Sequence, residues 1–243
     1  AAHNIAAVQA AAKPTLRSEK PVARTLPEIV AKRVELLTAY QDAAYAERYR
    51  AFVDKVAAAE KAKAPGRRGL AEAVARSLYK LMAYKDEYEV GRLYSDGEFL
   101  KKLSSQFEGD YTLAFHLAPP LFAERDPTTG QLKKREYGAW VMPMFRVLAS
   151  LKRLRGTKLD IFGYSEERRM ERRLIGEYQA TIEEVLASLG QDNHALAVQI
   201  ASVPETMRGF GHVKEKNVKA AREREASLLA AYRNPATQSV AAE

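Results

Sequence analysis

The sequence predicts a mainly α-helical, bundle-like domain with a small β-strand or hairpin insertion around residues 111–137. Three observations lead to this prediction. The 243-residue chain is rich in Ala, Leu, Glu, Lys and Arg and contains one Trp, a mixture that favours helix over sheet. Apolar side chains recur at helical spacing over most of the chain. They alternate, as in a strand, only over residues 111–117.

The expected organisation is one helical domain over residues 27–232. Residues 1–26 join a short apolar stretch to a Pro- and charge-containing connector, which is typical of a linker or the tail of an upstream domain. Residues 233–243 are expected to fray. No apolar run approaches the roughly 20 residues that span a bilayer, and the first residues do not resemble a secretory signal. We therefore expect a cytoplasmic protein without membrane contact.

The first helices are predicted from apolar stripes. Residues 27–60 carry Val, Leu, Tyr and Phe at three-, four- and eight-residue steps, which predicts one long helix with Pro27 in its first turn. A second helix is predicted from about Leu70 to Val90. The run Ser95-Asp96-Gly97-Glu98 has capping-box spacing and predicts a short helix that ends before Gly109.

The hydrophobic period then changes. Residues 111–117 predict an extended strand, and the turn signal Asp126-Pro127-Thr128-Thr129-Gly130 predicts a β-hairpin over residues 121–137. Helical periodicity resumes from Trp140 to Leu154. Ser165 is a suitable N-cap for a long helix that ends near Gly190. Two more helices are predicted, one over residues 193–202 and one after His212.

Several kinds of chemistry are missing from the sequence. The chain has no Cys, which excludes disulfides, a thiolate nucleophile, a Cys-ligated zinc site and a conventional iron–sulfur cluster within it. None of its four His residues lies three or four positions from another, so we expect structural or surface roles for them rather than metal binding. No nucleophile elbow, Walker A loop or kinase signature occurs. The sequence predicts neither a catalytic residue nor a metal site.

Positive charge is concentrated in the middle of the chain. The net charge is +8, and residues 131–175 hold twelve Lys or Arg against five acids. Such a field attracts nucleic acid, phosphate-bearing cofactors or acidic proteins. The candidates for anion or partner binding are Lys152, Arg153, Arg155, Arg168, Arg169, Arg172 and Arg173, with His212 at a helix start where backbone donors favour an anion. A solvated face, or ion pairing with Glu166, Glu167 and Glu171, is an equally good interpretation.

Tyrosines gather on the first two predicted helices. They are Tyr40, Tyr45, Tyr49, Tyr79, Tyr84 and Tyr88. Such rings could stack on the bases of single-stranded nucleic acid. We favour a tyrosine-rich helix interface whose hydroxyl groups find partners at its edge.

Seven strings, in this order, resemble the C-terminal region of fused indolepyruvate ferredoxin oxidoreductases. They are LTAYQDAAY (37–45), KLMAYKDEYEV (80–90), FEGDY (107–111), FHLAPPL (115–121), KRLRGT (152–157), FGY (162–164) and RGFGHVK (208–214). The resemblance covers roughly residues 27–225. It implies an accessory domain of an enzyme that converts aryl pyruvates to acyl-CoA and carbon dioxide and reduces ferredoxin.

The resemblance also implies cofactors and partners for the parent enzyme. Thiamine diphosphate, magnesium, [4Fe–4S] clusters and CoA are implied there, with none of them bound by this chain. Other domains of the same oligomeric oxidoreductase would be its partners, and ferredoxin or CoA could meet the basic stretch. The alternatives are a stand-alone basic nucleic-acid-binding protein, which no binding signature favours, and a structural or oligomerisation module.

Overall fold

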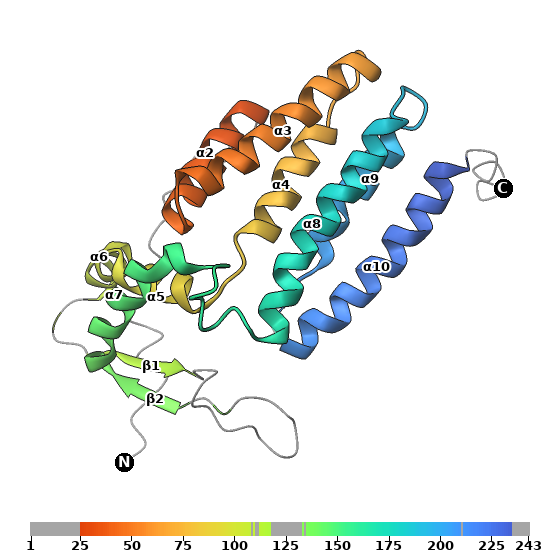
Figure 1. Ribbon diagram of the computed structural model, residues 1–243. Helices are drawn as coiled ribbons and strands as arrows, with labels where there is room; N and C mark the ends of the chain where they lie inside the picture. Colours follow the sequence, from red (N-terminus) through yellow and green to blue (C-terminus); the bar gives the residue numbers. More distant parts are fainter. Residues whose placement is uncertain are drawn as a thin grey trace, which may run out of the picture. The chain divides into compact units, whose positions relative to one another are not determined.

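The computed structural model describes residues 25–107, 109, 112–117, 133, 135–209 and 211–234. The protein is mainly α-helical with one small two-stranded antiparallel sheet, as predicted (Figure 1). Its described residues fall into two compact units. We call residues 86–152 the insert unit, and residues 25–85 together with 153–234 the bundle unit. The predicted linker lies almost entirely outside the described residues, as do the predicted turn at 126–130 and most of the predicted tail.

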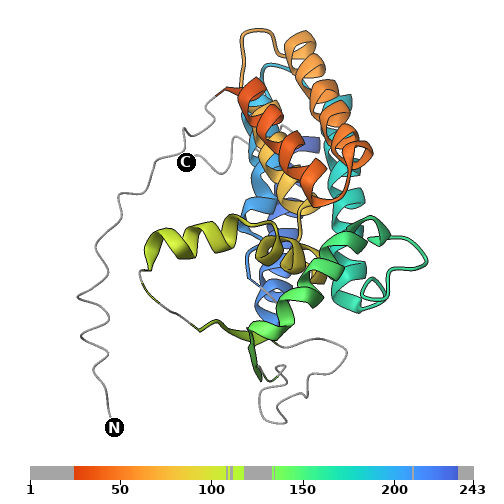
Figure 2. The same cartoon turned by 90° about the vertical axis from the view of Figure 1, so that its left-hand side faces the viewer.

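The bundle unit is built from long helices. They are α2 (Leu26–Tyr40), α3 (Ala43–Lys63), α4 (Leu70–Met82), α8 (Glu166–Ala187), α9 (His194–Ser202) and α10 (Gly211–Arg233), with the 3-10 turn η3 (Val203–Thr206) before α10. Helix α4 packs against α2, α3, α8 and α9, and most of its residues are buried (Figure 2). A helix that is apolar on most sides belongs in the interior of a bundle.

Two predicted long helices are wrong because each is broken by a capping aspartate. The predicted helix over 27–60 divides at Asp42, whose carboxylate accepts a hydrogen bond from Tyr45 N at 2.8 Å and starts α3. The predicted helix over 70–90 divides at Asp86, which accepts from Glu89 N at 2.9 Å and starts α5 (Glu87–Ser95). Aspartate is among the best N-cap residues because its oxygen satisfies a free backbone N–H.

A side chain from α3 caps the start of α4. The N-cap residue of α4 is Gly69, which has no side chain to offer. The buried carboxylate of Glu60 instead accepts hydrogen bonds from Leu70 N at 2.8 Å and Ala71 N at 2.9 Å. His194 Nε2 lies 2.7 Å from Glu60 Oε1, and its ring is also buried. His194 therefore has the structural role expected from the sequence.

The insert unit packs a short hairpin against two helices. Beside α5 it contains α6 (Glu98–Gln106), β1 (Ala114–Leu117), β2 (Arg135–Gly138), η1 (Ala139–Val141) and α7 (Met142–Ser150), and the 3-10 turn η2 (Leu151–Leu154) follows. Phe115 pairs with Tyr137 across the two antiparallel strands. The core is aromatic: the ring of Tyr94 lies 5.3 Å from that of Phe115 and 5.2 Å from that of Phe145.

The predicted caps fare differently in the two units. Ser165 is the N-cap of α8 as expected, because its hydroxyl accepts from Arg168 N at 3.3 Å. The capping box at residues 95–98 is wrong. Ser95 ends α5, and Gly97, with φ +84°, precedes α6.

None of the described helices has an apolar stretch of the length and hydrophobicity that crossing a membrane requires.

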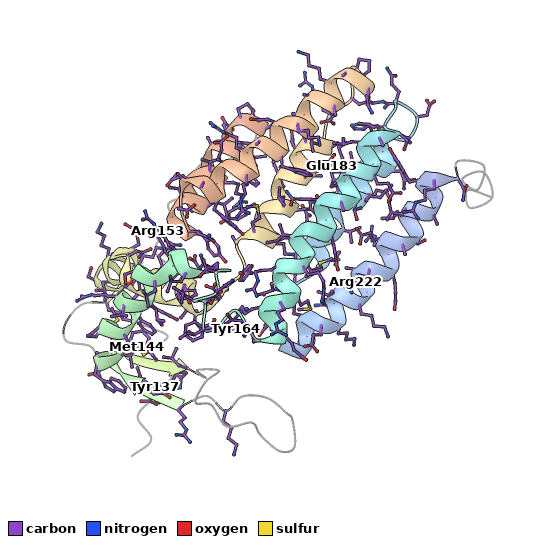
Figure 3. The ribbon with its side chains drawn as sticks, viewed as in Figure 1. Tyr137, Met144, Arg153, Tyr164, Glu183 and Arg222 are labelled. Atoms are coloured by element: carbon purple, nitrogen blue, oxygen red, sulfur yellow. The ribbon has the colours of Figure 1, made fainter. Side chains whose placement is uncertain are left out.

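One face of the insert unit leaves large apolar side chains exposed. Trp140 is 70% exposed and Val147 57% exposed, and Met144 and Leu151 are also exposed (Met144 is labelled in Figure 3). Their positions follow helical spacing, so the four side chains lie on one face of η1, α7 and η2. We call these four residues the α7 face.

Candidate functional site

Three tyrosines join the first helices of the bundle unit to α4 and the residues after it. The hydroxyl groups of Tyr40, Tyr45 and Tyr49 donate to the carbonyl oxygens of Tyr84, Met82 and Ala75, each at 2.9 Å. All three rings are buried. The predicted tyrosine interface is confirmed for these residues, and their rings cannot stack on bases while the bundle is folded. Burial raises the pKa of the Tyr49 hydroxyl above its ordinary value.

Arg155, a predicted anion-binding residue, is buried against this interface. Its side chain is 4% exposed. The guanidinium carbon lies 3.6 Å from the centre of the Tyr40 ring, and one nitrogen donates to Tyr40 O at 2.8 Å. Through this stacking and this hydrogen bond, Arg155 stabilises the C-terminal end of α2.

The loop after Arg155 is organised by one buried aspartate. Asp160 accepts hydrogen bonds from Gly156 N at 2.7 Å and Gly163 N at 3.0 Å, one on each carboxylate oxygen. A Cβ atom at Gly163 would overlap the Asp160 carboxylate. Arg172 of α8 donates to Gly163 O and lies 3.7 Å from Asp160 Oδ2. Arg172, another predicted site residue, thus anchors this loop to α8.

Arg168 is also held by an internal partner. Its guanidinium lies 2.5 Å from Glu171 Oε2, and the other carboxylate oxygen of Glu171 accepts from Lys214 of α10. Glu171 is buried, with only 4% of its side chain exposed. The internal ion pairing that the sequence left open is therefore present for Arg168.

The other predicted residues are spread over the surface or belong elsewhere. Arg153 and Arg169 are exposed (Figure 3 labels Arg153), and Arg173 lies 3.4 Å from Glu177. Lys152 is the last residue of the insert unit. His212 is in the first turn of α10, and its side chain is outside the described residues. The structure does not gather the predicted residues into one site, and their binding role stays a prediction.

A cavity of about 290 Å³ lies in the bundle unit at the ends of α4 and η3 and the start of α10. Its lining residues are Lys80, Leu81, Ala83, Tyr84, Lys85, Glu171, Leu174, Met207, Arg208, Gly209 and Lys214. Four cationic side chains thus face one carboxylate. We call this cavity the cationic pocket, and it is the candidate functional site.

The cations of the pocket differ in how firmly they are held. Lys80 donates to Pro204 O at 2.9 Å and to Glu205 O at 2.8 Å. Burial and then the charge of Arg208 lower the pKa of Lys80; the charge of Glu205 partly offsets this, and Lys214 lowers it slightly further. Neither Lys85 nor Arg208 has a carboxylate within 4.0 Å among the residues that the structure describes, and both are exposed. The pocket therefore carries an excess of positive charge.

Sequence reasoning missed this pocket because its walls are far apart in the chain. Residues 80–85 and 208–214 are separated by more than a hundred positions, and neither segment is strongly basic by itself. Both segments lie in strings quoted in the sequence analysis, and described residues of four of these strings meet in the bundle unit. Tyr40 contacts Tyr84 and Arg155, and Lys80 and Lys85 line the pocket with Arg208 and Lys214.

Comparison with known proteins assigns the chain to a family. Residues 26–227 match a family that is described as a family of unknown function (DUF6537). The chain belongs to the DUF6537 family. The match spans both the bundle unit and the insert unit. No curated protein and no solved structure matches the chain.

The side chains of this DUF6537 chain do not suit the metal and iron–sulfur cofactors that the resemblance implies. The chain offers no Cys to a [4Fe–4S] cluster. Among residues 25–234, with the gaps given above, no group of three or more His, Asp or Glu side chains could hold a metal ion.

Proposed function

We propose that the chain is an accessory helical domain of a 2-oxoacid:ferredoxin oxidoreductase of the indolepyruvate type. In this role it supports the oxidative decarboxylation of an aryl pyruvate to acyl-CoA, while the reaction itself takes place in other domains. The enzyme would be cytoplasmic and oligomeric. Its thiamine diphosphate, magnesium and [4Fe–4S] clusters would be bound outside this chain.

The resemblance of the seven strings supports this proposal. The strings supply Tyr40, Tyr84 and Arg155, which contact one another in the bundle unit, and Lys80, Lys85, Arg208 and Lys214, which line the pocket. Two proteins with the same fold are expected to resemble each other at residues that stabilise the fold, and Tyr40, Tyr84 and Arg155 are such residues.

The observation that carries the proposal is the α7 face. Trp140, Met144, Val147 and Leu151 expose four large apolar side chains on a single helical face. A contiguous exposed apolar face of this kind typically marks a site of interaction with another protein or domain. Aromatic residues and Met are enriched at the centres of such interfaces. We assign the face to another domain of the same oxidoreductase. The exposed side chains of Arg153, Arg169 and Arg173 remain available to acidic ferredoxin or to CoA phosphates.

The proposal is tested by purifying the tagged chain from its native cell. The purified material should catalyse the reduction of ferredoxin that depends on both indolepyruvate and CoA. The double variant Trp140→Asp with Val147→Asp should lower the activity that is recovered by about tenfold or more, because charge at the centre of an interface abolishes docking.

A matched control introduces the same charge elsewhere in the insert unit. Ser104 and Ser105 are exposed residues of α6. Changing both to Asp should leave the recovered activity within about twofold of the wild type. Wild-type material without indolepyruvate-dependent activity would exclude the oxidoreductase role. Equal losses in the two double variants would exclude docking through the α7 face.

A further inference from the structure

We infer that the cationic pocket binds a small organic anion: an apolar body that carries a carboxylate or a phosphate group. The inference does not rest on the oxidoreductase role and would hold for a chain with any other function. It assigns a ligand site to the lining residues given above, none of which was among the binding candidates predicted from the sequence.

The head group of the ligand follows from the charges around the pocket. The lining contains Lys80, Lys85, Arg208 and Lys214, and Glu171 is its single carboxylate among the residues that the structure describes. That carboxylate is already shared between Arg168 and Lys214. The lowered pKa of Lys80, caused by burial and then by Arg208, agrees with cations crowded around one space. An anionic group placed there would relieve their mutual repulsion.

Lys85 and Arg208 are the side chains best placed to hold the anion. Both line the pocket and are exposed, and the described structure gives neither a carboxylate partner. The guanidinium of Arg208 donates through Nε to Glu205 O at 3.1 Å, which orients the group. Its remaining N–H donors suit a planar carboxylate or a phosphate.

The body of the ligand follows from the rest of the lining. Leu81, Leu174 and Met207 are buried residues of the pocket wall, and Ala83 and Tyr84 add apolar surface. A volume of about 290 Å³ lies at the lower end of the roughly 300–1,000 Å³ that is usual for ligand pockets. The site therefore fits a ring or a short aliphatic chain with one anionic group, and it is too small for a whole nucleotide coenzyme.

The test is a titration of the full chain with three probes, followed by NMR and calorimetry. Phenyl phosphate and phenylacetate carry an apolar body with a phosphate or a carboxylate, and inorganic phosphate has no apolar body. At least one aryl probe should bind about tenfold more tightly than inorganic phosphate, because the ring adds apolar burial. The amide signals of residues 83–85 and 208–209 should shift. The tighter of the two aryl probes identifies the head group.

Three variants separate pocket binding from general attraction. Lys85→Gln with Arg208→Gln should weaken the better aryl probe by about tenfold. Lys216→Gln with Lys219→Gln removes the same charge from exposed positions of α10 and should weaken it by less than about twofold. Ala83→Leu, which changes no charge, should block the aryl probes by filling the pocket.

The results that would overturn the inference are equally specific. A wild-type chain that binds none of the three probes, or that binds inorganic phosphate as tightly as the aryl probes, contradicts it. Equal losses of affinity in the two double variants, or wild-type affinity in Ala83→Leu, also contradict it. Thermal unfolding of each variant verifies that the bundle is intact, which is expected since Lys85 and Arg208 are exposed.

Discussion

Two groups of cations in the bundle unit differ in their partners. Arg155, Arg168 and Arg172, which come from the most basic stretch of the sequence, are held by Tyr40, by Glu171, and by the loop around Asp160. Lys85 and Arg208, which come from unremarkable stretches, lack a carboxylate partner among the described residues. A high density of positive charge along the chain therefore does not predict which cations are available to a ligand, because Arg153 and Arg169 of the same basic stretch are exposed while Arg155 is buried.

The cost of burial explains this difference. A charged group that leaves water must find partners within the protein, or it destabilises the fold by several kcal/mol. Arg155 is nearly inaccessible and stacks on Tyr40, whereas Lys85 and Arg208 keep contact with solvent. Exposure therefore decides which cations can meet a ligand, and linear charge density does not.

The largest effect is expected at Glu171, which pairs with Arg168 and also lines the cationic pocket. Glu171→Gln leaves Arg168 and Lys214 without their shared counter-charge, so the free energy of unfolding should fall by about 3 kcal/mol. The same change removes the only carboxylate of the pocket lining, so the better aryl probe should bind more tightly. Urea unfolding and calorimetry measure the two effects. Unchanged stability would show that the arginine group does not depend on this carboxylate.

The next largest effect is a difference in stability between variants of two neighbouring arginines, Arg155 and Arg153. Arg155→Gln removes the stacking on Tyr40 and the hydrogen bond to Tyr40 O. We expect its free energy of unfolding to fall by about 2 kcal/mol. Arg153→Gln, two positions away and exposed, should change it by less than about 0.5 kcal/mol. Similar losses at both positions in urea unfolding would contradict the division into held and available cations.

Two glycines sharpen the comparison at the loop that holds Arg172. Gly163→Ala places a methyl group against the Asp160 carboxylate and should lower the free energy of unfolding by about 1–3 kcal/mol. Gly176→Ala, inside α8, meets nothing within 4 Å and should raise it by roughly 0.5–1 kcal/mol. Thermal and urea unfolding give both values. A Gly163→Ala chain as stable as the wild type would mean that the loop does not need this close approach.

The smallest effect is a fall in the free energy of unfolding at alkaline pH, caused by the buried hydroxyl groups of Tyr49 and Tyr178. Burial raises the pKa of Tyr49 and Tyr178 above the ordinary value of about 10. The unfolded chain therefore loses these protons first, and the free energy of unfolding should be constant with respect to these groups below about pH 10 and fall above it. Tyr49→Phe should lower stability by about 1 kcal/mol at neutral pH and make the alkaline decline shallower. An equally steep decline in the variant would contradict a buried neutral Tyr49.

Much of the fold could be predicted because helical periodicity and caps are local. The start of α8 at Ser165 and the tyrosine interface follow from short-range patterns. The breaks at Asp42 and Asp86 were missed because apolar spacing continues across them, although Asp86 with Glu89 three residues later is a recognisable helix start. The spacing that suggested a cap at Ser95 was misleading, since the chain turns there through Gly97.

The candidate site was less predictable for a physical reason. Its lining comes from α4, α8 and the start of α10, and only packing brings Lys80, Glu171 and Arg208 together. The arginine candidates, in contrast, were visible in the sequence, but their partners were not. Tyr40 lies 115 positions from Arg155, and no pattern in the sequence predicts a contact over that separation.

The most direct test of this account measures both stability and anion affinity in Arg155→Gln and Arg208→Gln. Arg155→Gln should lower the free energy of unfolding and leave the affinity for the better aryl probe within about twofold of the wild type at temperatures where it is folded. Arg208→Gln should weaken the affinity and leave stability within about 0.5 kcal/mol. If instead both variants lose stability and affinity in the same proportion, held and available cations are not distinct groups.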